Sequence, residues 1–155
     1  IEAIRQSDGT YQAFTDNGRN RTGRDPVSWA MEAEDLGAGE ILLTSVDQEG
    51  TGEGLDMDLI RQVHAKINVP LVVHGGIGRS EHALAIAKEL PVSGIALASM
   101  LHYHYLLTNR QVDGFEEEGN IEFLKSDRIY SKVVPTTLKE LKESLSSNNL
   151  VCRLA

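Results

Sequence analysis

Three glycines stand within four residues where an apolar run meets a helix-forming run, in the segment VVHGGIGRSEHA over residues 72–83. Glycine at such a junction lets another backbone or a ligand approach the chain closely. The N-terminus of a following helix presents free N–H groups and a partial positive charge, which attract anions. The segment therefore indicates a phosphate site. The alternative is a tight turn without a ligand, since glycine turns are common at strand ends.

The other chemistry-bearing residues form weaker patterns. His102 and His104 alternate, and His74 and His82 flank the glycine turn, but they lack carboxylate or cysteine companions at ligand spacing. A zinc site needs three or four converging donors, so we expect no metal and no cofactor. His74, beside the turn, is a candidate ligand contact instead. GIGRSE lacks the third glycine and distal acidic residue of a dinucleotide fingerprint. Cys152 is expected to pack as a small hydrophobe.

Apolar runs and helical patterns alternate through the middle of the chain. Short continuous apolar runs are typical of parallel strands that are covered on both faces. They lie at residues 39–46, 69–75 and 92–99. Asp25, Asp56 and Ser80 each precede residues with helical spacing and are expected to begin helices. Strands and helices in this order predict right-handed parallel crossovers.

The flanking segments are less regular. SDG and DNG surround TYQAFT and predict a small hairpin ahead of the first helix. The remaining expectations are a strand end at 1–5, a long irregular excursion at 109–137, a helix at 138–145 and a strand-like piece at 151–154. About four strand–helix units result, half of what a closed eight-fold barrel of ~250 residues uses.

Composition limits the classes of function. The 155 residues, 1–155, are expected to form a single domain. A formal net charge of −8 argues against nucleic acid and anionic membrane surfaces as partners. No apolar run approaches the ~20 residues of a membrane span. The single cysteine, Cys152, excludes an internal disulfide and fits a cytoplasmic location.

The segment GAGEILLTSVDQEGTGEGLD, residues 37–56, resembles the cyclase subunit of imidazole glycerol phosphate synthase, the HisF family of TIM barrels. The stretches TDNGRNRTGRDPVSWA, GGIG, ALASMLHY, LKELKESL and VCRL agree with the same family in order. The match corresponds to barrel strands five to eight. The resemblance therefore implies an α/β fold, a (β/α)4 half of a TIM barrel with parallel strands and outer helices.

The resemblance also implies a reaction. The family converts a bis-phosphorylated ribulose aminoimidazole-carboxamide intermediate, with ammonia from a glutaminase subunit, into imidazole glycerol phosphate. Each half of its barrel holds one substrate phosphate and one acid/base aspartate. The chain is thus expected to be a lyase of histidine biosynthesis if a full barrel is assembled.

Four residues form the phosphate cradle that the resemblance implies. Gly50 follows strand six, Gly76 follows strand seven, and Ala98 and Ser99 follow strand eight. Their backbone N–H groups and the Ser99 hydroxyl would surround one phosphate. Parallel barrels commonly bind phosphate in the loops after strands seven and eight, which agrees with this prediction.

Glu2 aligns with the family's second-half acid/base aspartate, and its carboxylate is the candidate for moving protons during ring closure. Thr44, at the end of strand six, is the candidate for substrate positioning, since barrel enzymes place chemistry at strand ends. Glu49 stands where the family has an aspartate near the phosphate. The structural alternatives are a solvated Glu2 at a frayed chain end, a loop cap for Asp47 and a solvated Glu49.

A half-barrel on its own exposes apolar strand faces beyond what a monomer usually leaves open. We therefore expect two-fold self-association, or pairing with another half-barrel, that rebuilds eight strands. Three functions compete at this point: a cyclase, a phosphate-binding module without turnover, and a non-enzymatic piece that completes a barrel. A paralogue that serves amidation of surface sugars is a related alternative.

Overall fold

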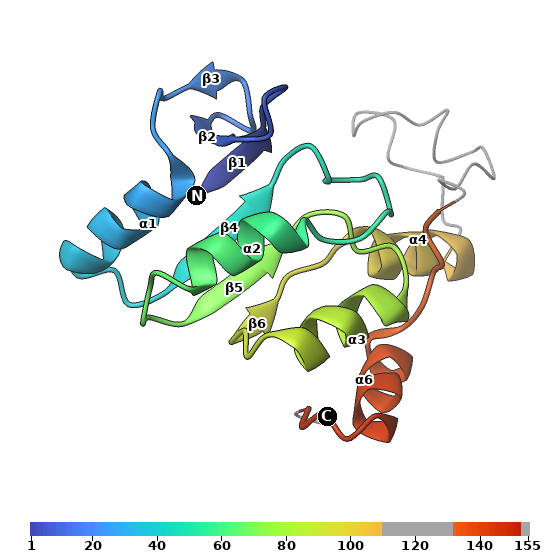
Figure 1. The fold of residues 1–155 in the computed structure, drawn as a ribbon. Coiled ribbons are helices and arrows are strands. Elements are labelled where there is room, and N and C mark those ends of the chain that lie inside the picture. The colour runs from blue at the N-terminus through green and yellow to red at the C-terminus, as the bar shows by residue number, and fades with distance from the viewer. Residues whose placement is uncertain (110–131, 153–155) are drawn as a thin grey trace.

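The computed structural model describes residues 1–109 and 132–152, and Figure 1 shows their arrangement. A six-stranded sheet runs through the molecule in the order β3-β2-β1-β4-β5-β6. Its strands are β1 (Glu2–Arg5), β2 (Tyr11–Thr15), β3 (Asn20–Arg21), β4 (Ile41–Ser45), β5 (Leu71–His74) and β6 (Gly94–Ile95). Neighbours among β1, β4, β5 and β6 pair in parallel, whereas β2 and β3 are antiparallel additions beyond β1.

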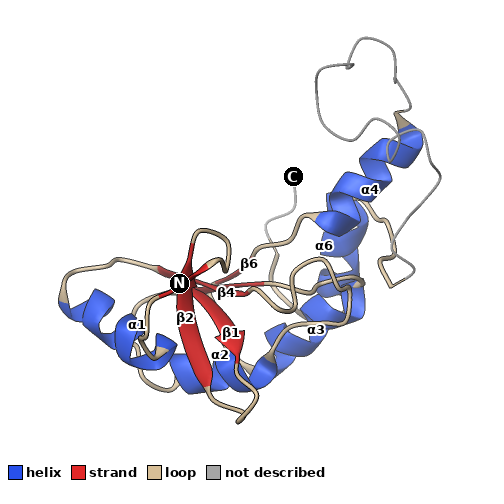
Figure 2. Cartoon of the chain, turned by 90° about the horizontal axis from the view of Figure 1, so that it is seen from above, coloured by secondary structure: helices blue, strands red, loops and turns tan. Residues whose placement is uncertain are grey.

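Helices connect the parallel strands, as the sequence predicts, and two more follow the last strand. They are α1 (Pro26–Asp35), α2 (Met57–His64), α3 (Ser80–Glu89), α4 (Ser99–Thr108) and α6 (Leu138–Ser147). Seen from above, α1, α2 and α3 follow one side of the sheet (Figure 2). The chain is therefore α/β with four parallel strands and outer helices, which is half of a TIM barrel. The prediction of fold class is confirmed.

Two of the three predicted helix starts are caps. The carboxylate of Asp25 accepts a hydrogen bond from the Ser28 N–H at 2.7 Å, and Pro26 is the first helical residue. Asp56 caps α2 by accepting from the Leu59 N–H at 3.1 Å. The prediction that Ser80 begins the third helix is confirmed, because Ser80 is the first residue of α3; the cap is Arg79, which makes no side-chain hydrogen bond.

The predicted hairpin is larger than expected. SDG turns the chain between β1 and β2, and DNG turns it between β2 and β3, with φ of 57°, 54° and 78° at Asp16, Asn17 and Gly18. Both turns use residues that tolerate left-handed backbone. The result is a three-stranded meander in which β2 occupies the edge of β1 that faces away from β4.

Most of the predicted excursion, residues 110–131, lies outside the described residues. The helix predicted at 138–145 is present as α6, and a capping box at Thr137 and Glu140 begins it. The strand-like piece predicted at 151–154 is not a strand at Val151 and Cys152, and its last two residues lie outside the described range. No helix in the described ranges combines the length and the apolar character needed to cross a bilayer.

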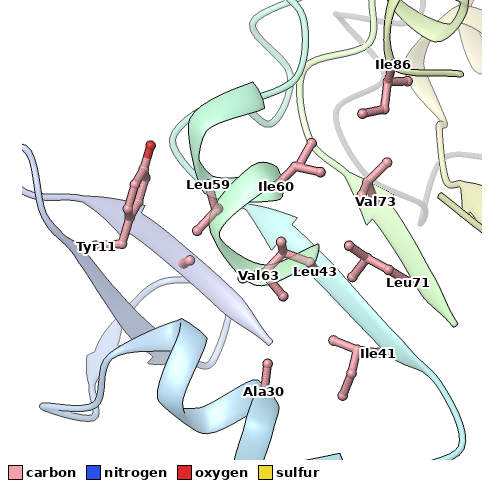
Figure 3. Close-up of a cluster of buried hydrophobic side chains, with 11 residues drawn as sticks. Tyr11, Ala30, Ile41, Leu43, Leu59, Ile60, Val63, Leu71, Val73 and Ile86 are labelled. Atoms are coloured by element: carbon pink, nitrogen blue, oxygen red, sulfur yellow. The ribbon is translucent and has the colours of Figure 1, made fainter. Parts of the chain in front are cut away.

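The main core lies between the sheet and its three covering helices. Leu59, Ile60 and Val63 of α2 point onto Leu43 of β4 and Val73 of β5, and all five are at most 3% exposed (Figure 3). Each buried aliphatic side chain of this size stabilises the fold by about 2 kcal/mol. A second cluster joins α3, α4 and α6 around Ile77, Met100 and Leu141. These two clusters fix the strands and therefore the loops that follow them.

The opposite face of the sheet is bare within the described residues. Leu42 alternates with the buried Ile41 and Leu43 and is 48% exposed, although it stands in a central strand. No described helix lies over this face in the view from above (Figure 2). This surface corresponds to the inside of a closed barrel, and we call it the open face.

Candidate functional site

The loops that follow β4, β5 and β6 meet at one edge of the sheet, because parallel strands place their carboxyl ends together. They enclose a pocket of about 170 Å³. That volume accommodates a phosphate, whose four oxygens are each comparable to a water molecule of about 30 Å³. The lining residues are Glu49, Gly50 and Gly52 from the first loop, His74, Gly75, Gly76 and Ile77 from the second, and Ala96, Leu97, Ala98 and Ser99 from the third.

The predicted cradle residues therefore lie together. Gly50, Gly76, Ala98 and Ser99 all line this pocket, and Ser99 is the first residue of α4. Among the described residues, the backbone N–H groups of Gly50, Gly76 and Ala98 donate no hydrogen bond. They remain available to a ligand, together with the positive end of α4. The Gly78 N–H, by contrast, already donates to Nδ1 of His82 at 3.3 Å.

Gly76 shows why the sequence concentrates glycines at this turn. Its φ is +96°, and an added Cβ would lie 2.0 Å from the carbonyl oxygen of Gly54. The Gly54 N–H in turn donates to the Gly76 carbonyl at 2.8 Å. Gly75 is similar, since a Cβ there would lie 2.4 Å from the Ser45 carbonyl oxygen. The glycines let the first two loops touch backbone to backbone, which brings both to the same pocket.

Three polar side chains form a row across the open face beside the pocket. Glu2 is the register partner of Thr44, and Thr44 is the register partner of His74, so all three share one face. The Thr44 Oγ1 lies 3.4 Å from Nδ1 of His74. Glu49 joins the row from its loop, with Oε1 3.5 Å from the same nitrogen. The predicted catalytic residues Glu2 and Thr44 are thus adjacent.

Glu2 is held in place. It belongs to β1, pairs with β2 on one side and β4 on the other, and is half-buried. Its Oε2 accepts a hydrogen bond from the Gly18 N–H at 3.0 Å, so the DNG turn orients the carboxylate. The alternative of a frayed chain end is therefore wrong. No sequence signal connected the DNG turn to Glu2, because the contact depends on how β2 folds back.

The alternative for Asp47 fits the structure. Its Oδ1 accepts a hydrogen bond from the Ser45 hydroxyl at 2.9 Å, and Asp47 does not line the pocket. It closes the start of the loop rather than facing a ligand. Within the described ranges, no three His, Cys, Asp or Glu side chains lie close enough together to hold a metal ion.

A buried network holds the far end of the same loop. Asp56, with its side chain 4% exposed, accepts hydrogen bonds from the Tyr11 hydroxyl at 2.8 Å and from Arg5 Nη2 at 3.1 Å. Burial raises the pKa of Asp56, but the hydrogen bonds from Arg5, Leu59 and Tyr11 outweigh it and hold this pKa below its ordinary value. The network ties β1 and β2 to the start of α2, and so fixes the loop that carries Gly50.

A larger pocket of about 710 Å³ lies elsewhere, between α3, β6 and α6. Its walls are mainly aliphatic, including Leu90, Ile95, Leu141 and Leu145, and it lacks the converging polar groups of a site that binds an ionic substrate. The smaller pocket at the carboxyl ends of the strands remains the candidate site.

Residues 1–126 match the family model described as "Histidine biosynthesis protein". The chain belongs to this family. Within it, the chain is 51% identical over 81 residues to imidazole glycerol phosphate synthase subunit HisF of Legionella pneumophila, covering 52% of this chain and 38% of that protein. The resemblance to HisF proteins noted from the sequence is confirmed.

Two further HisF subunits are likewise matched over only part of their length. That of Streptococcus sanguinis (strain SK36) is 39% identical over 103 residues, which are 66% of this chain and 41% of that protein. That of Pyrobaculum aerophilum is 42% identical over 112 residues, 72% of this chain and 44% of that protein. The chain thus matches less than half the length of these curated relatives.

Proposed function

We propose that this chain carries the phosphate-binding half of a HisF-like cyclase site. The substrate would be a bis-phosphorylated ribulose aminoimidazole-carboxamide intermediate, which reacts with ammonia to form imidazole glycerol phosphate. The observation that carries the proposal is the convergence of three loops on one pocket beside Glu2 and Thr44. HisF relatives named as synthase subunits support the same reaction.

In this proposal the main chain binds one substrate phosphate. The free N–H groups of Gly50, Gly76 and Ala98 and the hydroxyl of Ser99 are the donors, aided by the N-terminus of α4. Glu2 transfers protons during ring closure, and Thr44, its neighbour in register, positions the substrate between the carboxylate and the pocket. A glutaminase subunit is the proposed source of ammonia, since the relatives are named as subunits of a synthase.

Substitution of Gly50 tests the cradle. Gly50 has φ of +73°, and an added Cβ would meet nothing within 4 Å. Asp and Asn both tolerate left-handed backbone, so Gly50→Asp and Gly50→Asn differ mainly in charge. Titration with inorganic phosphate, followed by NMR, should show binding by the wild type and by Gly50→Asn and a loss of about tenfold or more in Gly50→Asp. Equal affinity of the two variants for phosphate would contradict the proposed phosphate cradle.

A phosphate-binding module without turnover is the second candidate. It is favoured by the lining of the pocket, which includes Gly50, Gly76, Ala98 and Ser99 but neither Glu2 nor Thr44. An ammonia-dependent cyclase assay separates the two functions. Turnover that Glu2→Gln abolishes supports the cyclase, whereas phosphate binding with no turnover supports the module.

We propose that a second half-barrel, from another copy or another polypeptide, covers the open face. The exposed Leu42 and the unpaired outer edge of β6 among the described strands support this arrangement. The opposite edge of β1 is already occupied by β2 over all four residues of β1, so a second copy cannot pair there without displacing β2. Packing would therefore use the faces of the two sheets more than their edges.

Light scattering at micromolar concentration tests this association. Leu42→Lys should shift the protein toward monomers, because it places a charge on the packed face. Leu36→Lys is the matched control, since Leu36 is 82% exposed at the end of α1 on the helix side. A wild type that is a well-folded monomer at all concentrations would contradict the arrangement.

A further inference from the structure

The pocket holds very little positive charge for a phosphate site. Of the described side chains that line it, His74 alone can carry a positive charge, and Glu49 contributes a negative one. The remaining lining groups are backbone, aliphatic side chains and the Ser99 hydroxyl. Because a phosphate ester carries at least one negative charge, the protonation state of His74 decides the electrostatic balance of the pocket.

The two ring nitrogens of His74 have different surroundings. Nδ1 lies 3.4 Å from the Thr44 Oγ1 and 3.5 Å from Oε1 of Glu49. Among the described residues, no hydrogen bond engages Nε2. A carboxylate only accepts, so Glu49 favours the tautomer with its proton on Nδ1. In that neutral tautomer, Nε2 carries a lone pair and no proton, so it cannot donate a hydrogen bond to an anion and repels it.

We propose that His74 controls the anion affinity of this pocket by binding the phosphate through Nε2 only after the ring takes up a proton. This inference rests on the proposed function of the pocket. Glu49 acts as the positioning residue, because it holds the first proton on Nδ1 and leaves Nε2 for the second. Anion binding and proton uptake are then a single coupled event.

Other charged groups near the site do not replace His74. On the described elements beside the pocket, the titratable side chains are Glu2 on β1, Asp47, Glu49 and Glu53 in the loop after β4, Arg79 and His82 at the start of α3, and Lys132. Lys132 is paired with Glu53, and burial, reinforced by the charge of Arg79, lowers the pKa of His82. Within residues 1–109 and 132–152, Glu49 is the one acidic residue that forms an ion pair with His74. The pH dependence of anion binding is therefore assigned to His74.

Calorimetric titration with sulfate between about pH 5.5 and 8 tests the inference, since sulfate stays doubly charged over this range and a change in affinity then comes from the protein. Wild-type affinity should rise about tenfold from the upper to the lower pH, the size of one charge-assisted hydrogen bond. Titrations in buffers of different ionisation enthalpy should show uptake of about one proton per sulfate near the upper limit.

Two variants separate the roles of the ring and the carboxylate. His74→Gln keeps an N–H donor without a charge, so sulfate binding should persist, lose its pH dependence and take up no proton. Glu49→Gln lets the neutral ring carry its proton on Nε2, so binding at the upper pH should tighten and proton uptake should fall. His102→Gln, on the exposed surface of α4, is the control and should behave as the wild type.

These experiments distinguish a failure of the inference about His74 from a failure of the proposed phosphate site. If the wild type binds sulfate and Gly50→Asp weakens it, but His74→Gln retains the pH dependence, His74 does not control the anion affinity and the cradle stands. If the wild type binds neither sulfate nor phosphate, the cradle fails and this inference fails with it.

Discussion

Asp56 offers the sharpest test of how the fold positions the candidate site. Asp56→Ala removes three interactions of a buried carboxylate: the cap of α2, the acceptor for Tyr11, and the partner of Arg5. Loss of an aspartate cap costs about 1 kcal/mol. Leaving the buried Tyr11 hydroxyl without its acceptor costs about 2 kcal/mol more. The contact with the exposed Arg5 adds little, because solvent screens it.

The expected destabilisation of Asp56→Ala is therefore about 3 kcal/mol, or a fall in Tm of roughly 6–12 °C for a chain of this size. Asp56→Asn keeps a capping oxygen and an acceptor, so it should cost about 1 kcal/mol. Asp58→Asn is the control: Asp58 also contacts Arg5, but its side chain is 60% exposed, and we expect a change within about 0.5 kcal/mol. Urea and thermal unfolding measure all three.

The pH dependence of stability provides a second measurement on the same residue. The pKa of Asp56 is below its ordinary value in the folded state, so the carboxylate stabilises the fold above the unfolded pKa of about 3.9. That stability is lost as the pH falls through the lower folded pKa. Asp56→Asn should show a shallower loss of stability in acid. Asp56→Ala within about 0.5 kcal/mol of the wild type, or Asp58→Asn as damaging as Asp56→Ala, would refute the reasoning.

Two further predictions concern the glycine turn and the last helix. Gly76→Ala should destabilise the fold by about 3 kcal/mol or more, measured by urea unfolding, because the new methyl group meets the Gly54 backbone. Gly9→Ala has a similar φ of +86° and open space, so it should cost only about 1 kcal/mol, and an equal cost would contradict the steric explanation. Thr137→Ala removes half of the capping box of α6 and should cost about 1 kcal/mol. It should also raise the pKa of Glu140 part of the way toward its ordinary value when followed by NMR, because the hydrogen bond from the Thr137 backbone N–H, the largest cause of the lowered pKa, remains while that from the hydroxyl is lost; a pKa restored fully to its ordinary value would contradict this division.

The parts of the fold that followed from the sequence are those with local signals. Asp25 with Pro26, and Asp56 ahead of an amphipathic run, mark helix starts by hydrogen bonds made within one turn. Ser80 is the first residue of α3, as predicted, although the cap is the preceding Arg79 and makes no side-chain hydrogen bond. The boundaries of α4 had no local signal, since Ala98 cannot cap and contacts with Met100 and Tyr103 hold the helix to its neighbours.

The candidate site likewise combines features that the sequence predicted with features that depend on tertiary structure. The glycine turn was visible because three glycines in four residues are a strong local pattern, and its meeting with two other loops followed from the parallel strand order. The contact between Gly18 and Glu2 was not predictable, because it joins a hairpin turn to a strand across 16 residues. The pairing of Arg5 with Asp56 spans 51 residues and likewise depends on tertiary structure.

The contact between Gly54 and Gly76 consists entirely of backbone atoms, and this affects how such a protein can diverge. Because the contact involves no side chains, no substitution at Gly76 can weaken it gradually: any side chain there clashes with the Gly54 carbonyl oxygen. The two loops therefore keep this contact only as long as the glycine is kept. The neighbouring side chains on the bare sheet surface carry no such constraint. Under the proposed function, point mutations on that surface would change which substrate tails fit, while the rim that binds the anionic end would stay unchanged.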